Sequence, residues 1–204
     1  MATSLIYRSA SLYEFAMLLL YGRHYASRYR AIAGLIPAGS SVLDLCCGPA
    51  HLYHRYLRTK AVRYTGLDVN ANFISRLIRR GGLGQVWDLR GEEALPEADY
   101  VIMQASLYHF LPDASPIVDR MLRAAQKRVI IAEPIRNLAN SNSRLLSLLG
   151  RFFTNPGAGE HIHRFTKASL AGFFSGYASR VVESFTIAGG REQVYVLRGN
   201  KAHA

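Results

Sequence analysis

The stretch that most constrains the fold is VLDLCCGPA, residues 42–50. Its apolar residues suit a strand covered on both faces, and the strand ends at an acid and a turn of small residues. Gly48 permits close approach of a ligand to the backbone, and Pro49 fits the first turn of a helix. Backbone N–H groups at such a helix start point toward the polar end of a bound ligand. The sequence therefore predicts a strand–turn–helix junction that binds a nucleotide-like molecule.

A second acid supports this interpretation. Asp68 closes another apolar run, YTGLDV, and a carboxylate at a strand end can accept hydrogen bonds from two ribose hydroxyls. A dinucleotide oxidoreductase would carry GxGxxG at the first turn, so that a pyrophosphate could approach the helix. This chain has CCGPAH there, with Gly48 as its one glycine, which argues against a dehydrogenase. Asp44, beside the turn, suits a ligand with an ammonium or a water-linked cation better than one with phosphates.

The stretch VLDLCCGPA resembles the first motif of class I S-adenosylmethionine-dependent methyltransferases, which usually reads as an acid followed by three alternating glycines. Asp68 matches their second acidic position. The stretch VWDLRGEEALPEADYVIMQASLYHF resembles the adenine-binding loop and fourth strand of the ubiquinone-biosynthesis-like, small-molecule branch, where Asp88 matches the acid near the adenine amino group. The resemblance covers residues 24–134 well and the C-terminal third in outline. It implies an enzyme that uses S-adenosylmethionine and releases S-adenosylhomocysteine.

The resemblance implies a cofactor site at the carboxyl ends of the strands. The implied cofactor-binding residues are Asp44, Cys46, Gly48, Asp68, Val69, Asp88, Leu89 and Gln104. Tyr21 and Tyr25 would close over the methionine end, as aromatic residues of N-terminal helices do in relatives; alternatively they belong to the core. Asp44 and Asp68, each taken alone, also fit helix caps. Cys46 and Ala50 replace usual glycines; Cys46 is tolerable there if its backbone angles are ordinary, whereas a strained positive φ would count against binding.

The acceptor side of the site is predicted from the histidines. His109 lies in SLYHF, which resembles the SLHHF-like stretch of the family, so it should border the methyl-transfer site beside Tyr108. A histidine suits proton removal from a hydroxyl acceptor at neutral pH, although His109 could instead cap the next helix or close the cofactor pocket. His161 and His163, in GEHIHRF, are predicted to reach the acceptor. Their spacing alone lacks the further ligands of a stable metal site, so no metal is expected.

Alternating strand-like and helix-like segments predict a Rossmann-like α/β fold, with a seven-stranded, mostly parallel sheet and helices on both faces. The parallel strands should end at or near Leu45, Asp68, Trp87, Gln104 and Glu133. A helix is expected from about Thr166 to Tyr177, and an antiparallel hairpin with a Gly-Gly turn follows it. We expect a single domain over residues 1–204, with an N-terminal helical cap over 1–36 that is broken near Gly22. Residues 135–165 form a lid or acceptor-binding insertion in this prediction.

Charge raises the question of anionic partners, because 25 Lys and Arg against 14 Asp and Glu leave a net charge of +11. Base-methylating relatives usually follow the fourth strand with an Asn or Asp, two prolines and an aromatic residue, which hold a flipped base. Residues 104–109 read QASLYH instead, which argues against nucleic acid. An apolar stripe in LLSLLGRFF, residues 145–153, either packs onto the domain or contacts a membrane surface or lipid-like acceptor.

The cysteines and the N-terminal segment bear on location. Cys46 and Cys47 are adjacent, which fits neither a disulfide framework nor a metal site and favours a reducing cytoplasm. The apolar run FAMLLLY, residues 15–21, is too short to span a bilayer, and we expect no signal peptide. The prediction is a cytoplasmic enzyme, with peripheral membrane contact as an option, that methylates a small-molecule or lipid-like acceptor. An RNA-modifying methyltransferase and a non-catalytic scaffold with the same fold are the alternatives, and the acceptor, the methylated atom and the oligomeric state stay open.

Overall fold

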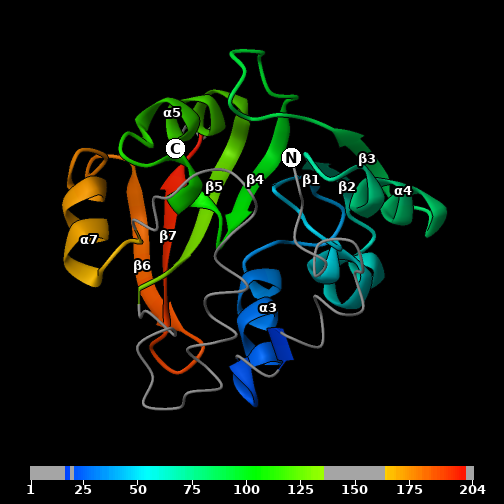
Figure 1. Ribbon diagram of the computed structural model, residues 1–204, viewed down its shortest axis with the longest axis horizontal. Coiled ribbons are helices and arrows are strands. Elements are labelled where there is room, and N and C mark those ends of the chain that lie inside the picture. The colour runs from blue at the N-terminus through cyan, green and yellow to red at the C-terminus, as the bar shows by residue number, and fades with distance from the viewer. Residues whose placement is uncertain (1–16, 19–20, 136–163, 201–204) are drawn as a thin grey trace.

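The computed structural model describes residues 17–18, 21–135 and 164–200 (Figure 1). His161, His163, the apolar stripe of residues 145–153 and nearly all of the expected lid lie outside the described residues, as does most of the chain before Tyr21. Within the described part, no helix has both the length and the apolar character needed to cross a bilayer.

The strands form one seven-stranded sheet in the order β3-β2-β1-β4-β5-β7-β6, as predicted for this fold (Figure 1). Strands β1 to β5 pair in parallel, whereas β7 runs antiparallel to both of its neighbours. The bounds are β1 Ser41–Leu45, β2 Arg63–Asp68, β3 Leu83–Val86, β4 Ala98–Gln104, β5 Ala125–Pro134, β6 Val181–Ile187 and β7 Glu192–Arg198. The predicted fold class, strand ends and C-terminal hairpin are therefore confirmed.

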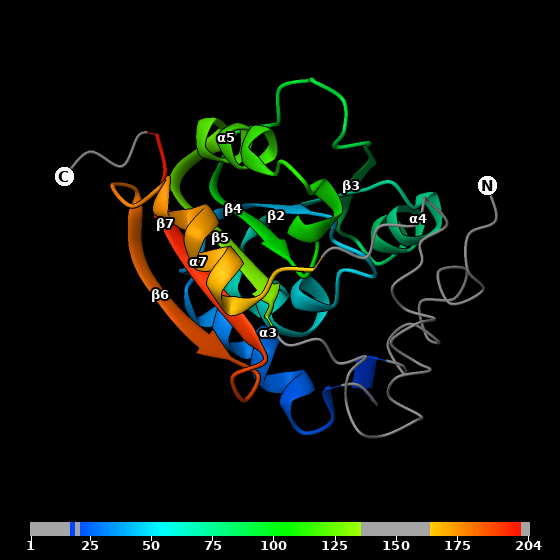
Figure 2. The ribbon, with the colours of Figure 1, turned by 60° about the vertical axis from the view of Figure 1, so that its left-hand side comes forward.

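Helices cover both faces of the sheet, which explains why the central strands are apolar on both sides (Figures 1 and 2). One apolar cluster lies beneath α3 (His24–Gly34) and the short helical turn η1 (Tyr53–Leu57), and it includes Leu77 of α4 (Ala71–Arg79); the turn η2 (Arg58–Lys60), which follows η1, adds no buried residue. A second cluster lies on the other face. It packs beneath η3 (Leu107–Phe110), α5 (Ser115–Ala124) and α7 (Lys167–Ser175).

Local sequence signals account for several element ends. Gly22 has a φ of +50°, which a glycine adopts without strain, and this turn makes the predicted break before α3. Thr166 caps α7: its hydroxyl accepts from the N–H of Ser169 at 3.0 Å, and the Ser169 hydroxyl accepts in return from the N–H of Thr166 at 2.9 Å. The helix predicted to begin near Pro49 begins at His51, because Ala50 has a left-handed φ of +53°.

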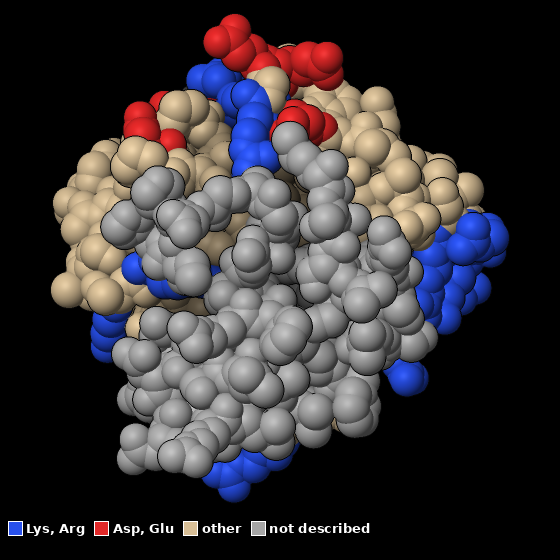
Figure 3. Space-filling model, in the orientation of Figure 1, with Lys and Arg blue, Asp and Glu red and all other residues tan. Residues whose placement is uncertain are grey.

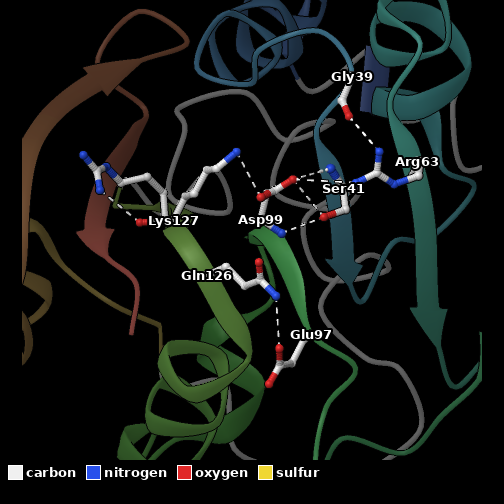
Figure 4. Close-up of polar contacts among 8 residues, drawn as sticks. Gly39, Ser41, Arg63, Glu97, Asp99, Gln126 and Lys127 are labelled. Carbon is white, nitrogen blue, oxygen red and sulfur yellow. Dashed lines mark hydrogen bonds and ion pairs between the residues drawn. The ribbon is translucent and has the colours of Figure 1, made fainter. Parts of the chain in front are cut away.

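Asp99 connects three strands at the amino edge of the sheet (Figure 4). One oxygen of its carboxylate accepts from the N–H and the hydroxyl of Ser41, at 2.9 and 3.0 Å, and the other lies 3.0 Å from Lys127 Nζ. The Ser41 N–H, with help from Lys127, holds the pKa of Asp99 below its ordinary value. These bonds join β1, β4 and β5 at the amino edge, whereas Asp44, Asp68 and Gln104 lie at the opposite, carboxyl edge.

Candidate cofactor site

The strand register brings the predicted polar residues to one edge and one face of the sheet. Asp44 pairs with Gly66 on β2, and Asp68 follows two residues later on the same face. Asp44 also pairs with Ile102 on β4, so Gln104 likewise lies on that face. Asp88 follows β3 two residues after Val86, the partner of Asp68, and its side chain is exposed. Three neighbouring strand ends thus present polar side chains to one place.

The turn after β1 keeps the shape that the glycine-rich motif implies. Cys46, Gly48 and Ala50 have φ values of +54°, +54° and +53°. The condition of ordinary angles at Cys46 is therefore not met: the backbone is left-handed at all three alternating positions, and a residue with a side chain adopts it at a cost of about 1–2 kcal/mol. The Cys46 side chain packs against the apolar cluster beneath α5 and α7.

Asp68 connects this turn to β2. Its Oδ2 accepts from the N–H of Gly48 at 2.8 Å, and its Oδ1 accepts from the N–H of Asn70 at 2.8 Å. Burial raises the pKa of Asp68, whereas these two N–H groups lower it in part. Asn70, not Asp68, is the cap of α4, since the Asn70 side chain accepts from the N–H of Asn72 at 3.0 Å. A carboxylate has about four acceptor positions, so Asp68 can still receive two hydroxyls.

Asp44 lies inside β1 and is buried. Its carboxylate accepts from the Tyr64 hydroxyl at 2.7 Å, and the Tyr64 ring stacks on Tyr53 at 4.4 Å between centroids. Burial raises the pKa of Asp44 to about 7, although the Tyr64 hydroxyl acts in the opposite direction. Asp44 thus bonds to a side chain of the neighbouring strand, which is not the helix-cap contact that was the alternative for this residue. A nearby cation would favour the charged form of this carboxyl.

Two buried polar atoms at the ends of β4 and β5 have no partner among the described residues. They are Nε2 of Gln104 and Oε1 of Glu133. The other oxygen of Glu133 accepts from the N–H of Leu107 at 3.0 Å, and burial raises the pKa of Glu133 to about 8. Sequence reasoning used Glu133 only as a strand end. The available signal was an acid that directly follows the apolar run VIIA at the carboxyl end of a parallel strand.

His109 and Tyr108 lie together on η3, with ring centroids 3.9 Å apart. The Arg164 guanidinium lies 3.5 Å from the centre of the Tyr108 ring. Burial, followed by the charges of Arg164 and Arg90, lowers the pKa of His109 to about 4, so the imidazole is neutral at pH 7 but is a weaker base than an ordinary histidine. His109 lines a cavity of about 740 Å³ whose other walls are the loop after β3 and α5, with Leu89 among them. This places His109 beside the predicted adenine loop, and its role as a base stays a prediction.

The two tyrosines that were predicted to cover the methionine end of the cofactor both lie in the apolar cluster beneath α3. The Tyr21 hydroxyl donates to Glu192, and Arg28 lies 4.5 Å from the Tyr21 ring and 2.8 Å from Glu192 in a fully buried ion pair. This position of Tyr21 matches the core alternative. Tyr25 is buried in the same apolar cluster, which also matches the core alternative, and its ring centroid lies 5.0 Å from that of His51, directly after the turn.

Two apolar residues follow the acids of β2 and β3. Val69 is 62% exposed, although it is a large apolar residue directly after Asp68. Leu89 is buried against the cluster beneath α5. An exposed apolar side chain next to a carboxylate at a strand end can contact a flat ring. Among the described residues, no three His, Cys, Asp or Glu side chains are grouped as a metal site.

Comparison with solved structures shows the class I methyltransferase fold. The chain solved in complex with the Haloferax volcanii Trm112 methyltransferase activator has a TM-score of 0.69 and 15% identity over 98% of this chain and 100% of that chain. Magnesium protoporphyrin IX methyltransferase from Synechocystis PCC 6803, with bound S-adenosylhomocysteine, has a TM-score of 0.65 and 13% identity over 96% of each chain.

The family assignment comes from the sequence itself. No curated protein matches the chain significantly. The family model described as methionine biosynthesis protein MetW matches residues 26–151, which is more than half of the chain and includes the turn and all the described strand ends from β1 to β5. The chain therefore belongs to the MetW family.

Proposed function

We propose that this protein transfers a methyl group from S-adenosylmethionine to a small-molecule acceptor and releases S-adenosylhomocysteine. The observation that carries the proposal is the junction of Asp68 with the turn. The carboxylate fixes the Gly48 N–H at 2.8 Å and keeps acceptor positions for two ribose hydroxyls. The positive φ at Cys46 is backbone strain that counts against binding, but the left-handed angles shared by Cys46, Gly48 and Ala50 retain the shape of the glycine-type turn, and that shape supports the same function.

The other residues of the site would divide the cofactor between them. Asp88 would accept from the adenine amino group, and Val69 would cover one face of the ring. The unpartnered amide donors of Gln104 and the buried charge of Asp44 would serve the amino-acid end, where an ammonium favours the ionised form of the carboxyl. The donor set of this edge therefore fits S-adenosylmethionine.

The main task of the protein in this reaction would be to align the acceptor with the methyl group. When bound, the sulfonium of the cofactor supplies an electrophilic methyl group. The chain would hold the acceptor in line with it and exclude water, and both contribute to the rate without a metal ligand set. His109 stays our proposed base for a hydroxyl acceptor because of its place on η3 beside Tyr108, and its lowered pKa means that it would hold the proton less tightly than an ordinary histidine.

The acceptor is proposed to be a small or lipid-like molecule, in keeping with the small-molecule branch that the sequence resembles. The residues after β4 carry no base clamp, and the Synechocystis neighbour is named for a porphyrin substrate. We place the protein in the cytoplasm, because Cys46 and Cys47 are both free thiols.

RNA stays the second candidate because of charge. The net charge is +11, basic side chains gather over α4 in Figure 3, and one neighbour was solved with the Trm112 activator. RNA binding driven by phosphate contacts would weaken steeply with added salt, whereas methylation of an uncharged small molecule would not. Gel-shift titration with RNA at two salt concentrations separates the two acceptor classes.

Calorimetric titration with S-adenosylhomocysteine tests the proposed function. The wild type should bind, and Asp68→Ala should weaken binding by about 2 kcal/mol or more, which is about thirtyfold, because two hydroxyls lose a charged acceptor. Asp99→Ala, at the amino edge, is the matched control and should bind as the wild type does. Absence of binding by the wild type would overturn the proposal.

A further inference from the structure

The loop between β3 and β4 has little structure of its own, although it carries Asp88 and Leu89. Residues 87–97 form neither helix nor strand. The loop opens with a short turn: the Asp88 carboxylate accepts from the N–H of Arg90 at 3.0 Å, and the Asp88 carbonyl accepts from the N–H of Gly91 at 3.2 Å. These two bonds shape the turn but leave its carbonyl groups without helix or strand partners.

One side chain from α5 gathers three of those carbonyls. The guanidinium of Arg120 donates to the carbonyls of Leu89 at 2.7 Å and Gly91 at 2.6 Å, and also to the carbonyl of Glu93. The three acceptors are alternate residues of the loop, and they lie 27 to 31 positions before Arg120. Guanidinium is suited to this task, because its donors are fixed in one plane.

The position of Arg120 separates this contact from ordinary surface charge. The side chain is half-buried, and it lines the cavity beside His109. In Figure 1 the loop stands next to α5, and Figure 3 shows basic and acidic side chains adjacent to each other over this part of the molecule. Arg123, one turn further along α5, lines the same cavity but is exposed, and it has no hydrogen bond to the loop in the described structure.

We propose that Arg120 is a positioning residue for the adenine end of the cofactor: by holding the carbonyls of Leu89, Gly91 and Glu93, it fixes the turn that presents Asp88. Arg120 touches neither the cofactor nor the acceptor in this proposal. It acts through the loop: because the loop is already ordered, binding of adenine at the Asp88 carboxylate does not cost the conformational entropy of ordering it. The inference rests on the proposed function.

The test compares two ligands that differ at the adenine amino group. S-inosylhomocysteine carries an oxo group where S-adenosylhomocysteine carries the amino group, so Asp88 should favour the adenosyl ligand. Arg120→Met keeps the length of the side chain and removes its donors. It should weaken the binding of S-adenosylhomocysteine about tenfold and leave the binding of S-inosylhomocysteine within about twofold of the wild-type value. The preference for the adenosyl ligand should therefore largely disappear. Arg123→Met is the matched control and should retain the wild-type preference.

Two further measurements keep structural effects apart from positioning. Hydrogen exchange of the amides of residues 88–93 should become faster in Arg120→Met, while that of the central strands stays unchanged. In a double-mutant cycle with Asp88→Ala, the effect of Arg120→Met on S-adenosylhomocysteine affinity should largely disappear. Arg120→Lys, with a single ammonium, should give an intermediate preference, and it serves as the test variant if Arg120→Met does not fold.

The outcomes test the role of Arg120 separately from the proposed function. Equal weakening of both ligands, or no change in either, would overturn the role of Arg120 while leaving the proposed function in place. Failure of the wild type to bind S-adenosylhomocysteine would overturn the proposed function, and with it the inference.

Discussion

Replacing Glu133 by Gln removes a carboxyl group that the fold holds in its neutral form. Glu133 is fully buried, its Oε2 accepts from the N–H of Leu107 at 3.0 Å, and its Oε1 has no partner among the described residues. Burial raises its pKa from 4.5 to about 8, against the opposing effect of the Leu107 N–H. Glutamine keeps an oxygen for Leu107 and carries no charge at any pH.

The sign of the pH effect follows from where the proton is held. Below about pH 4.5 both the folded and the unfolded chain carry the proton, so Glu133 adds no pH dependence. Between about 4.5 and about 8 the unfolded chain releases the proton while the folded chain keeps it, so the free energy of unfolding falls as pH rises. The difference of about 3.5 pKa units, 8 minus 4.5, sets an upper bound of roughly 5 kcal/mol. Relaxation of a real site lowers this, and we expect about 2 kcal/mol or more.

Urea unfolding of both chains at pH 5 and pH 8 measures the effect. Glu133→Gln should unfold with nearly the wild-type free energy at pH 5 and should be the more stable chain at pH 8. Asp44, whose pKa burial raises to about 7, titrates in both chains, so its contribution largely cancels in the difference. A difference that is equal at the two pH values, or a variant less stable at pH 8, would refute the reasoning.

Three other predictions concern the core, the thiols and the amino edge. Glu192→Ala leaves the Arg28 guanidinium buried without its partner 2.8 Å away, so urea unfolding should show a loss of about 3–5 kcal/mol; a loss below about 1 kcal/mol would count against the pair. Burial raises the thiol pKa values of Cys46 and Cys47, so iodoacetamide should modify both more slowly in the folded chain than in urea, and equal rates would contradict this. Asp99→Ala removes an acceptor and an ion-pair partner, so the free energy of unfolding should fall by about 1–3 kcal/mol with S-adenosylhomocysteine affinity unchanged; a weaker titration would contradict the separation of the two edges.

The strand ends were predictable because local sequence encodes them. Apolar runs end at acids in β1 and β2, and a parallel sheet brings those ends to one edge whatever the rest of the chain does. The final hairpin was readable from Gly189 and Gly190, whose φ values of +67° and +77° are the angles that the turn requires. The ends of the strands and the hairpin turn thus followed from local sequence patterns.

The contacts that were missed join residues far apart in the chain. Glu133 meets Leu107 across 26 positions, and Tyr21 meets Glu192 across 171, and no periodicity indicates which buried acid finds which partner. The left-handed angle at Cys46 was missed for a different reason. Residue type alone favours ordinary angles at a cysteine, whereas the glycine that the family motif usually carries at this position indicates the left-handed angle that the turn adopts.

The central claim is that the carboxyl edge holds an adenosyl cofactor between the turn and Asp68. A crystal structure of the protein with S-adenosylhomocysteine tests it most directly. The account predicts both ribose hydroxyls within hydrogen-bond distance of the Asp68 carboxylate, with the adenine against Val69 and its amino group at Asp88. A ligand bound elsewhere, or a ribose directed away from Asp68, would contradict it.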